Sequence, residues 1–572
     1  MIEHDDLGKA ARAGGSARRT YPFAEPPELR SSAVTQHPVV IAGGGPVGLA
    51  TALELARHGV RSVVLEKRDT VGNGSRAICW AKRTLEICDR LGTAERMRER
   101  GVTWSVGRVY AGPSPEPVFS FDLLPDKAQK FPAFVNLQQY YAEEYLIDQL
   151  SEQPEAELRW QSEVVHVDSA RDGVMVTVRT PAGAYQLYCE YLIAADGQRS
   201  TIRGMLALDL EGRGFEDPFL LVDVKMKASF PPESRFWFDP PFNPGQTASL
   251  HKQADDVWRL DFQLGRGVDR AQALAPEHVE AKVRGFLGSE ADFAYEWVSL
   301  HTFQCRRMAR FVHGRVIFAG DAAHVVPPFG ARGANGGLQD VDNFGWKLAL
   351  ILRGLAPGSL LDSYDAERGY AADESLLSST RSADFMTPQG AASRAFRDAV
   401  LDLSQDFGFA RRIVNTGRLS VPCTLDGSPL NTEDQEKFSR RHRPGAVCRD
   451  APVVIDGVEG WFLERLGGQF VGILFTDEGD IGAADYSALE GRPIPVGSLT
   501  VKPPGASGKG VVIDRDGLLY RHYDARPGTY YLVRPDQHVA GRWRRFERGK
   551  VEAALARATG RQTESRRSPE GG

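Results

Sequence analysis

The sequence predicts an α/β fold of more than one domain, and three observations support this. A strand–helix–strand pattern of about thirty residues begins at residue 38. Two stretches further along the chain alternate Val, Tyr, Phe and Trp between Pro and Gly turns, and a separate small α/β pattern follows residue 430. The 572 residues, against roughly 150 for a typical domain, leave room for all three parts.

The N-terminal part starts with a segment of no regular pattern. Residues 1–36 contain Gly-Gly-Ser, Pro-Pro and scattered charges, so we expect an extended or disordered extension. The apolar run 38–42 predicts a buried strand, and helical spacing over 46–58 predicts a helix that Gly59 ends. Residues 61–66 predict the second strand, which completes a βαβ unit.

The remaining elements alternate between sheet and helix patterns. Alternation over 105–135 and 160–265 predicts antiparallel sheet. Helical periodicity returns over 336–355 and again over 360–367. Beyond about residue 430 we expect a small α/β unit, with apolar runs at 470–475, 510–514 and 530–534, a helix over 548–559 and a frayed tail at 560–572.

Composition and charge exclude several classes of protein. With 42% hydrophobic and 25% charged residues the chain has ordinary globular composition. The 70 Lys and Arg against 75 Asp and Glu give a net charge of −5 without a basic stripe, so we expect no nucleic-acid partner. The N-terminus does not resemble a signal peptide, and residues 39–53 are too short and too rich in Gly and Pro to span a bilayer. We therefore expect a cytoplasmic protein with no membrane partner.

The strongest motif is a glycine turn between the first strand and the first helix. Gly43, Gly45 and Gly48 form a GxGxxG pattern, and Glu66 ends the second strand eighteen residues beyond Gly48. Gly43 permits the tight turn, Gly45 lets backbone N–H groups approach a pyrophosphate, and Gly48 permits close helix–strand contact. A carboxylate in the place of Glu66 accepts hydrogen bonds from ribose hydroxyls. The sequence therefore predicts a dinucleotide site.

Further motifs separate FAD from NAD as the dinucleotide. Residues 196–203 (DGQRSTIR) and 320–324 (GDAAH) each follow an apolar strand, and matching residues continue through 327–368. Together these motifs resemble the class A flavin monooxygenases, the family that contains para-hydroxybenzoate hydroxylase and phenol hydroxylase. The resemblance covers about residues 38–380 and implies a Rossmann-like FAD-binding domain with an inserted antiparallel-sheet substrate domain.

The resemblance also implies a division into domains. The FAD-binding domain would occupy residues 37–430, interleaved with a substrate part mainly at 105–135 and 205–305. Residues 431–572 resemble the thioredoxin-like domain of phenol hydroxylase relatives but contain no CxxC. Without paired thiols this domain cannot exchange disulfides, so packing or contact within a homodimer is the expected role.

Family roles can be carried over residue by residue. Asp321 would hold the ribityl chain, although a helix N-cap is an alternative for the same residue. Ala334 and Asn335, which follow Gly333, would direct backbone N–H groups at the flavin pyrimidine edge. Arg76 would lie near the pyrophosphate and the nicotinamide donor.

Three further positions complete the predicted site. Gln139 fits the flavin-contacting glutamine, with Gln138 left open, and Asp196 would serve both FAD and the reductant. The Pro328 carbonyl would face the substrate, or the residue forms only a rigid turn. The cofactor residues are thus Gly43, Gly45, Pro46, Val47, Gly48, Glu66, Lys67, Arg76, Gln139, Asp196, Gly320, Asp321, Gly333, Ala334 and Asn335, with Arg76 and Pro328 as catalytic residues and no metal site.

The implied reaction is hydroxylation of a phenolic or related aromatic compound. NADPH or NADH would reduce FAD as a transient reductant, and O₂ would be captured as a flavin C4a-hydroperoxide. Within the family, the motif sequences most resemble those of 3-(3-hydroxyphenyl)propionate hydroxylase-like enzymes. Alternatives are epoxidation, Baeyer–Villiger or decarboxylative oxidation of an aromatic or polyketide substrate, or flavin binding without turnover. Candidates to face the substrate are Phe236, Trp237, Phe238, His251, Arg259, Gln263, His301 and Arg306.

Overall fold

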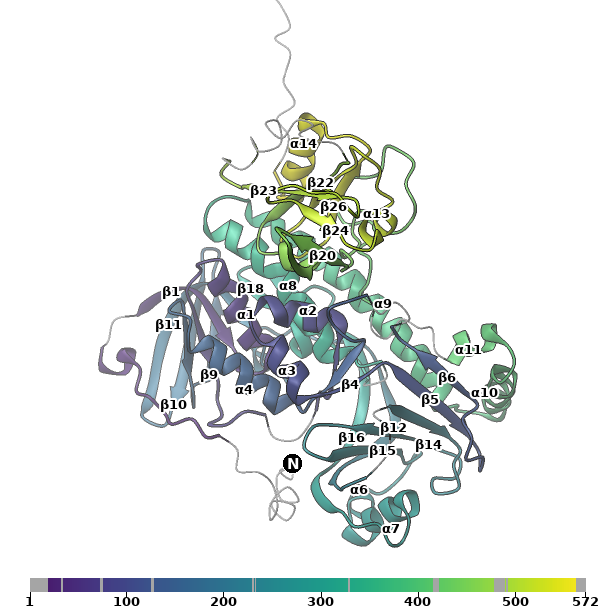
Figure 1. Ribbon diagram of the computed structural model, residues 1–572. Helices are drawn as coiled ribbons and strands as arrows, with labels where there is room; N and C mark the ends of the chain where they lie inside the picture. Colours follow the sequence, from purple (N-terminus) through teal and green to yellow (C-terminus); the bar gives the residue numbers. More distant parts are fainter. Residues whose placement is uncertain are drawn as a thin grey trace, which may run out of the picture.

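A computed structural model describes residues 19–31, 34–72, 76–124, 128–228, 231, 233–327, 330–414, 421–477, 489 and 492–561. Figure 1 shows a C-terminal unit in yellow at the top, a central α/β part, and a second sheet at the bottom. Within these ranges no helix has both the length and the apolar character that crossing a membrane requires.

The central part is built on an eight-stranded sheet. Its strands, in spatial order, are β17 (Val312–His313), β18 (Val316–Phe318), β11 (Gly183–Ala194), β1 (Thr35–Ala42), β2 (Ser62–Leu65) and β8 (Ala156–Arg159), and β10 (Val174–Thr180) and β9 (Glu163–Ser169) extend from β11. Five of these strands run parallel: β18, β11, β1, β2 and β8. All of β2 is buried, which explains its continuous apolar run.

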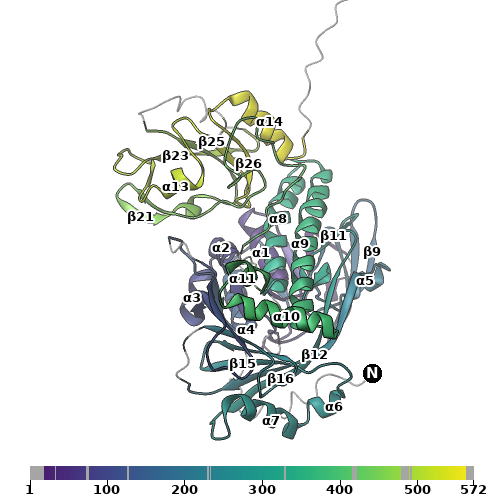
Figure 2. The same cartoon turned by 90° about the vertical axis from the view of Figure 1, so that its right-hand side faces the viewer.

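Helices cover this sheet, and their bounds refine the sequence prediction. α1 (Pro46–Arg57) packs against α4 (Gln139–Leu150) and α8 (Gly333–Leu352). α8 begins three residues earlier than the predicted helix. It also ends three residues earlier than predicted, because Gly354, just beyond its end, takes a left-handed φ of +67°. The helix predicted over 360–367 is the first part of α9 (Asp362–Met386), which lies beside α8 (Figure 2). Other helices here are α2 (Lys82–Arg90), α3 (Ala94–Arg100) and α5 (Thr201–Met205).

The described part of the N-terminal extension is docked on the central sheet. The ring of Tyr21 stacks on that of Trp160 with centroids 4.1 Å apart. Glu28, in a short 3-10 helix (Pro27–Arg30), accepts a hydrogen bond of 3.0 Å from Arg159 Nη1. The extended arm predicted for residues 1–36 is thus held in place over residues 19–30; residues 1–18 lie outside the described ranges.

The second sheet has eight strands and gathers two distant segments of the chain. Its order is β19 (His324–Val325), β16 (Ala294–Arg307), β12 (Glu211–Lys225), β15 (Val257–Gln263), β14 (Thr247–Lys252), β13 (Ser234–Phe238), β5 (Val106–Ala111) and β6 (Phe119–Asp122). Every pair is antiparallel except β13 with β5, which run parallel. A small sheet consists of β3 (Cys79–Ala81), β7 (Phe134–Asn136) and β4 (Val102–Trp104).

The two faces of the second sheet have different partners. Its outer face buries Leu220, Val222, Leu260 and other apolar side chains in one cluster with Val279 of α7 (Pro276–Leu287). Figure 2 shows α7 and α6 (Arg270–Ala273) beneath the sheet. Because side chains alternate along a strand, the residues between these point to the opposite face.

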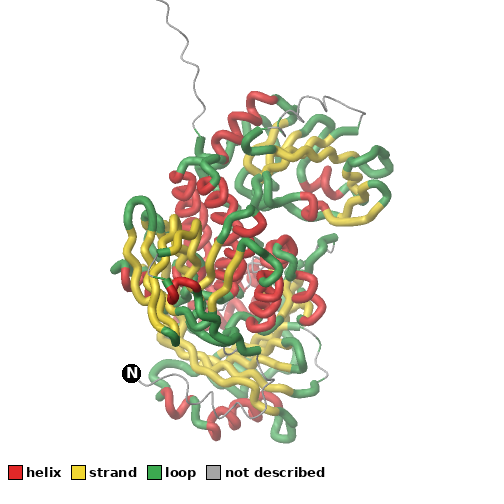
Figure 3. Tube along the Cα trace, turned by 90° about the vertical axis from the view of Figure 1, so that its left-hand side faces the viewer, coloured by secondary structure: helices red, strands yellow, loops and turns green. Residues whose placement is uncertain are grey.

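The described part of the C-terminal unit is a seven-stranded mixed sheet with two helices, at the upper right of Figure 3. Its strands are β21 (Val458–Trp461), β20 (Pro452–Ile455), β24 (Val512–Asp514), β23 (Val496–Lys502), β22 (Phe470–Phe475), β25 (Tyr530–Val533) and β26 (Val539–Trp543), with helices α13 (Leu518–His522) and α14 (Arg548–Ala558). The three predicted apolar runs all contribute strands. Two helices that the sequence analysis did not predict, α10 (Ala391–Ser404) and α11 (Gly408–Val414), precede this unit.

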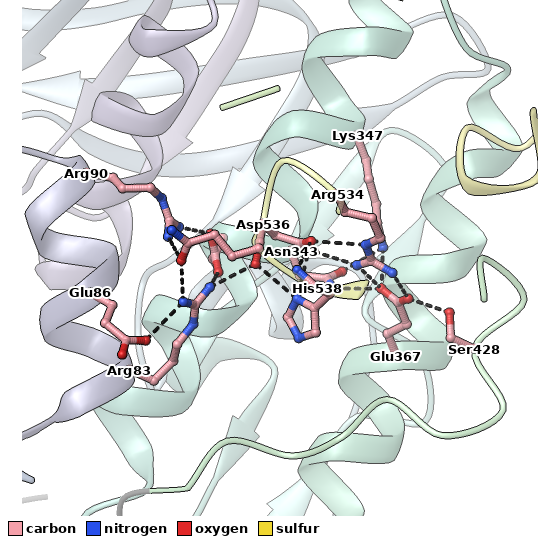
Figure 4. Close-up of polar contacts among 12 residues, drawn as sticks. Arg83, Glu86, Arg90, Asn343, Lys347, Glu367, Ser428, Arg534, Asp536 and His538 are labelled. Carbon is pink, nitrogen blue, oxygen red and sulfur yellow. Dashed lines mark hydrogen bonds and ion pairs between the residues drawn. The ribbon is translucent and has the colours of Figure 1, made fainter. Parts of the chain in front are cut away.

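A buried network of charged side chains joins the C-terminal unit to α8 and α9. Arg534, which follows β25, donates to Glu367 of α9 at 2.5 and 3.0 Å and to Asp536 Oδ1 at 3.0 Å. Lys347 of α8 donates to Glu367 Oε2 at 2.7 Å, and the Ser428 hydroxyl donates to Oε1 at 2.5 Å. Figure 4 shows Arg534 between the two carboxylates. We call these five residues the docking network.

The same loop also reaches α2. Arg83 donates to the Asp536 carbonyl at 2.9 Å, to Gln537 Oε1 at 2.6 Å and to Asp342 Oδ2 at 2.7 Å. Arg90 contacts Gln537 and Asp342 as well (Figure 4 labels both arginines). Three elements of the central part, α2, α8 and α9, therefore meet the C-terminal unit through hydrogen-bonded charges.

Candidate active site

One cleft of about 2260 Å³ connects the central sheet to the inner face of the second sheet. Its walls include the turn after β1, the end of β2, the turn after β11 and the beginning of α8. Ligands of α/β sheets bind beyond the carboxyl ends of parallel strands, which is where this cleft begins. The volume exceeds the 300–1,000 Å³ of ordinary small-molecule sites.

The glycine turn has the geometry that the sequence predicts. Gly43 has φ +108°, and a Cβ there would lie 2.4 Å from the Ala195 carbonyl oxygen. A Cβ on Gly48 would lie 1.9 Å from the Gly43 carbonyl oxygen, so no side chain fits between helix and turn. A Cβ on Gly45, in contrast, would meet nothing within 4 Å and would occupy the cleft. Gly45 thus leaves room for a ligand against the N-terminus of α1.

Glu66 lies beside this turn with its carboxylate held by two neighbours. Its Oε2 accepts a hydrogen bond of 2.7 Å from Gly44 N, and its Oε1 accepts one of 2.8 Å from Arg68 Nε. Burial disfavours the ionised form, but the hydrogen bonds and the charge of Arg68 outweigh burial and lower the pKa of Glu66. The carboxylate is therefore ionised at the cleft wall, next to the exposed Lys67.

Two aspartates line the cleft on the far side of the turn. Asp196 Oδ2 accepts from Ile202 N at 3.2 Å, whereas its buried Oδ1 has no hydrogen-bond partner among the described residues. Asp321 is open to the cleft. Desolvation by the surrounding protein raises the pKa of its carboxyl group, although the charges of His324 and Arg76 oppose this rise. Both carboxylates offer acceptor oxygens to hydroxyl groups of a ligand.

The turn that carries Asp321 is held by two motif residues to which the sequence analysis assigned no role. His324 Nε2 lies 2.7 Å from Asp340 Oδ2. The same oxygen accepts a hydrogen bond of 2.9 Å from Gly320 N. Gly320 is not among the residues that line the cleft, and its predicted contact with the cofactor stays a prediction. Its φ is +59° and a Cβ would lie 2.8 Å from Val47 Cγ2, so Gly320 lets this turn approach α1.

The first turn of α8 faces the cleft with Gly333, Ala334 and Asn335. Backbone N–H groups at a helix start have no intrahelical acceptor, which leaves them available to a ligand. The Asn335 side chain is used differently: its Oδ1 accepts from Ala81 N at 2.9 Å and from Thr84 Oγ1 at 2.6 Å. These bonds tie α8 to β3 and α2.

The structure places Gln139 and Gln138 differently. Gln139 lines the cleft, accepts from Ala77 N at 3.1 Å and donates to Glu143 at 2.8 Å. Gln138 is buried away from the cleft and donates to the Ala254 carbonyl at 3.0 Å. The sequence analysis missed Glu143, although its position one helical turn after Gln139 is a signal for such a pair. Arg76 is exposed at the cleft wall, and Pro328 lies outside the described residues.

The candidates for substrate contact divide into two groups. Five of the eight line the cleft: Phe236, His251, Arg259, His301 and Arg306. The other three do not. The Trp237 ring stacks on Tyr110, Phe238 packs against Phe385, and Gln263 Oε1 accepts from Thr247 N at 3.1 Å.

The face of the second sheet that lines the cleft is called the cleft face below. It includes Phe219, Leu221, Phe236, Ser249, His251, Arg259, Asp261, Trp297, Ser299, His301 and Arg306. Arg259 donates to both oxygens of buried Asp223, at 2.7 and 2.8 Å, so this pair is neutral overall. Ser249 and Asp261 were not among the sequence candidates, although the period of two from His251 and Arg259 points to both.

The residues fit FAD as a bound cofactor. The cleft left open by Gly45, the N-termini of α1 and α8, and the acceptors on Glu66 and Asp321 provide for a pyrophosphate, a ribose and a polyol chain in one continuous space.

Comparison with known proteins agrees with this site. A family model described as "FAD binding domain" matches residues 36–377. A 6-methylpretetramide 4-monooxygenase of Streptomyces rimosus is 30% identical, over 90% of this chain and 92% of that protein. A 3-(3-hydroxy-phenyl)propionate/3-hydroxycinnamic acid hydroxylase of Mycolicibacterium smegmatis is 28% identical, over 88% of this chain and 90% of that protein.

Solved structures share the fold across most of the chain. A complex of aklavinone-11 hydroxylase with FAD and aklavinone superposes with a TM-score of 0.77 at 22% identity, covering 92% of this chain and all of that one (100%). A complex of the flavin-dependent monooxygenase PieE with FAD and substrate gives a TM-score of 0.76, also at 22% identity, over 92% of this chain and 99% of that one.

Proposed function

This chain belongs to the FAD binding domain family and is an FAD-dependent monooxygenase of aromatic compounds, and from that premise we propose that it hydroxylates a phenolic substrate held against the cleft face. NADPH or NADH serves as the reductant and O₂ as the source of the oxygen atom. The observation that carries the proposal is the single cleft, which joins the glycine turn to an aromatic-lined sheet without an intervening wall.

We assign the cofactor half of the cleft as follows. Gly43, Gly45 and the start of α1 hold the pyrophosphate, Glu66 accepts from the adenosine ribose, and Asp321 accepts from the ribityl chain. Gly45 supports this most directly, because its missing side chain is what keeps the space open. Pro46, Val47 and Lys67 line the same wall, and Gly48 supports the turn from behind.

The residues around the flavin ring have the remaining roles. Backbone N–H groups of Gly333, Ala334 and Asn335 face the pyrimidine edge, where the helix start favours negative charge. Gln139 contacts the ring, and Arg76 and Asp196 face the incoming nicotinamide donor. FAD, when bound, supplies the activation of O₂; the protein excludes water, orients the aromatic ring and controls the proton of its hydroxyl group.

A multi-ring aromatic substrate is a second candidate beside a single-ring phenol. Asp261 Oδ1 and Ser299 Oγ are buried without hydrogen-bond partners in the described structure, and Leu221 separates them. Two strand spacings place their backbones about 10 Å apart. That separation suits polar groups at opposite ends of a fused-ring compound, and the relative from Streptomyces rimosus is named for such a substrate.

The domain division is also part of the proposal. We assign residues 37–430 to the FAD-binding domain with its inserted substrate sheet, and 431–572 to a thioredoxin-like unit without redox function. Parallel β22, β23 and β24 beside antiparallel β25 and β26 support this, as does the lack of a disulfide at Cys423 and Cys448 in the described structure. Homodimer formation, the cytoplasmic location and the absence of nucleic-acid and membrane partners stay predictions.

The experiment that tests the function combines cofactor and product analysis. Heat treatment of the purified chain should release FAD, and NAD(P)H consumption should accelerate when the correct phenol is added. A panel of single-ring and fused-ring phenols, with mass analysis for one added oxygen, identifies the substrate class. Consumption of NAD(P)H that yields only peroxide with every compound would contradict the proposal.

The Asp321 assignment has its own test. Asp321→Ala should weaken FAD retention by roughly 1.5–3 kcal/mol for each charge-assisted hydrogen bond that is lost. Asp516→Ala, an exposed position in the C-terminal unit, serves as the control. Equal retention in both variants would show that Asp321 only shapes its turn.

A further inference from the structure

Two polar side chains, Ser249 and Asp261, lie side by side in a row that crosses the cleft face. By strand register, Phe236 on β13 is opposite Ser249 on β14, Ser249 is opposite Asp261 on β15, and Asp261 is opposite Leu221 on β12. All four residues line the cleft. Asp261 thus presents a carboxyl group between Ser249 and the aliphatic Leu221, with the aromatic Phe236 one strand beyond Ser249.

Asp261 is the end point of a chain of hydrogen bonds. Ser249 Oγ lies 3.0 Å from Asp261 Oδ2, and an ionised carboxylate only accepts, so the serine hydroxyl donates. Ser249 Oγ also lies 3.2 Å from His251 Nε2, and His251 Nδ1 lies 3.0 Å from Ser234 Oγ. With Nε2 protonated and Nδ1 accepting from Ser234, every hydrogen in the chain points towards Asp261.

The charged and titratable groups around Asp261 are otherwise balanced. They are Arg259 on the same strand, Asp223 on β12, His251 on β14 and Cys79 on β3. Arg259 is paired with Asp223. Burial and the charge of Arg259 lower the pKa of His251 to about 3, so the imidazole is neutral. Burial raises the pKa of Cys79 to about 12, with a contribution from Asp261, so this thiol keeps its proton.

Asp261 is therefore the one carboxylate of this group without a cation paired to it. Its side chain is 22% exposed, although Oδ1 is buried without a hydrogen-bond partner in the described part of the chain. Burial raises the pKa of Asp261 against the opposing charge of Arg259 and the Ser249 hydrogen bond. A carboxylate with a raised pKa is a stronger base than one in water.

We propose that Asp261 accepts the proton of the substrate's phenolic hydroxyl, with Ser249 and His251 as the residues that position its carboxylate. The proposal rests on the proposed function, since it supplies the proton acceptor for that hydroxylation. In this step the O–H bond of the phenol breaks, its electron pair stays on the phenol oxygen, and a new O–H bond forms on Asp261. The net charge of the site does not change, and the ring becomes the more electron-rich phenolate.

The kinetic test uses FAD-loaded Asp261→Asn with phenol, 3-fluorophenol and 3,5-difluorophenol. Each fluorine makes the hydroxyl more acidic and changes its size little, so the need for a base decreases along the series. We expect the variant to form product about 10²–10⁴-fold more slowly with phenol. The loss should shrink with each fluorine, while KM changes little. An equal loss with all three compounds, or no loss, would overturn the proposal.

A binding test on the oxidised enzyme needs no turnover. Phenol donates a hydrogen bond that anisole, its methyl ether, cannot donate, and binding of each is followed by the change in flavin absorbance. Wild-type enzyme should prefer phenol by about tenfold or more, as expected for a hydrogen bond to a charged group. In Asp261→Asn the preference should approach one; a preserved preference would contradict the assignment.

Two variants separate this role from a structural one. Ser249→Ala keeps the carboxylate but removes its donor, and we expect an intermediate loss of rate with the same dependence on fluorination. Glu280→Gln removes a carboxylate from α7 under the outer face, where it accepts from Tyr295 at 2.6 Å, and should behave as wild type. If the wild-type enzyme hydroxylates no compound of the phenol panel, but its preference for phenol over anisole disappears in Asp261→Asn, the proposed function fails and the Asp261 contact stands.

Discussion

The docking network around Arg534 and the group around Asp261 are both buried clusters of charge, but only the first is closed. The side chains of Arg534, Glu367, Lys347 and Asp536 are 0% exposed, and each makes hydrogen bonds within the network. Asp261 is 22% exposed at the cleft and receives one hydrogen bond, from Ser249. A closed cluster holds two parts of a protein together, whereas an open one has an acceptor left for a ligand.

The pKa values of the carboxyl groups follow this difference. Burial opposes ionisation in both places, but Arg534 and Lys347 outweigh it at Glu367 and hold its pKa well below the usual range. At Asp261 burial prevails over Arg259, which is already paired with Asp223, and the pKa rises. At Glu367 two cations outweigh burial, whereas at Asp261 burial outweighs the one nearby cation.

The largest expected effect comes from opening the closed cluster. Arg534→Ala would leave the carboxylates of Glu367 and Asp536 buried with fewer partners, and we expect it to lower the free energy of unfolding by about 3–5 kcal/mol. Urea unfolding followed by circular dichroism measures this. The control is Arg515→Ala, whose side chain is 41% exposed beside Asp516 and should cost about 1 kcal/mol or less. Similar losses in the two variants would mean that the network does not dock the C-terminal unit.

A smaller effect is expected from acid. Because the folded pKa of Glu367 lies below its ordinary value of 4.5, its ionised form stabilises the fold above that pH and loses this contribution as the pH falls below it. Wild type should therefore be more stable than Glu367→Gln at neutral pH, and the difference should shrink on acidification towards about pH 3. Unfolding free energies of both proteins across this range check the sign. A constant difference would contradict it.

The smallest effect is expected at Asp261, with the opposite sign. A folded pKa above the ordinary 3.8 means that the carboxyl group contributes stability below that pH and loses it as the pH rises through the folded pKa. Asp261→Asn should thus be as stable as wild type at neutral pH, or more stable by about 1 kcal/mol. Thermal unfolding of the variant pair measures this. A clear loss of stability at neutral pH would place Asp261 with the closed cluster.

Sequence reasoning succeeded where neighbours in the chain determine the geometry. The turn at Gly43 and the side-chain-free approach at Gly48 follow from residues within one βαβ unit, and the structure confirms both. It did not foresee that the missing Cβ of Gly320 serves contact with Val47, because that contact joins segments far apart in the chain. Asp261 was missed although its spacing of two from Arg259 places it on the same face; only strand pairing shows that Ser249 and Leu221 flank it.

By itself, the sequence determined the elements whose periodicity is local: the glycine turn, the apolar runs of the C-terminal sheet and the helix that becomes α14. Only the tertiary structure decided which side chains meet across long distances, such as Arg534 with Glu367, 167 positions apart, or Ser249 with Asp261 through strand register. The physical reason is that dihedral preferences and hydrophobic spacing act over a few residues. Pairing between distant segments depends instead on register and on packing of the whole chain.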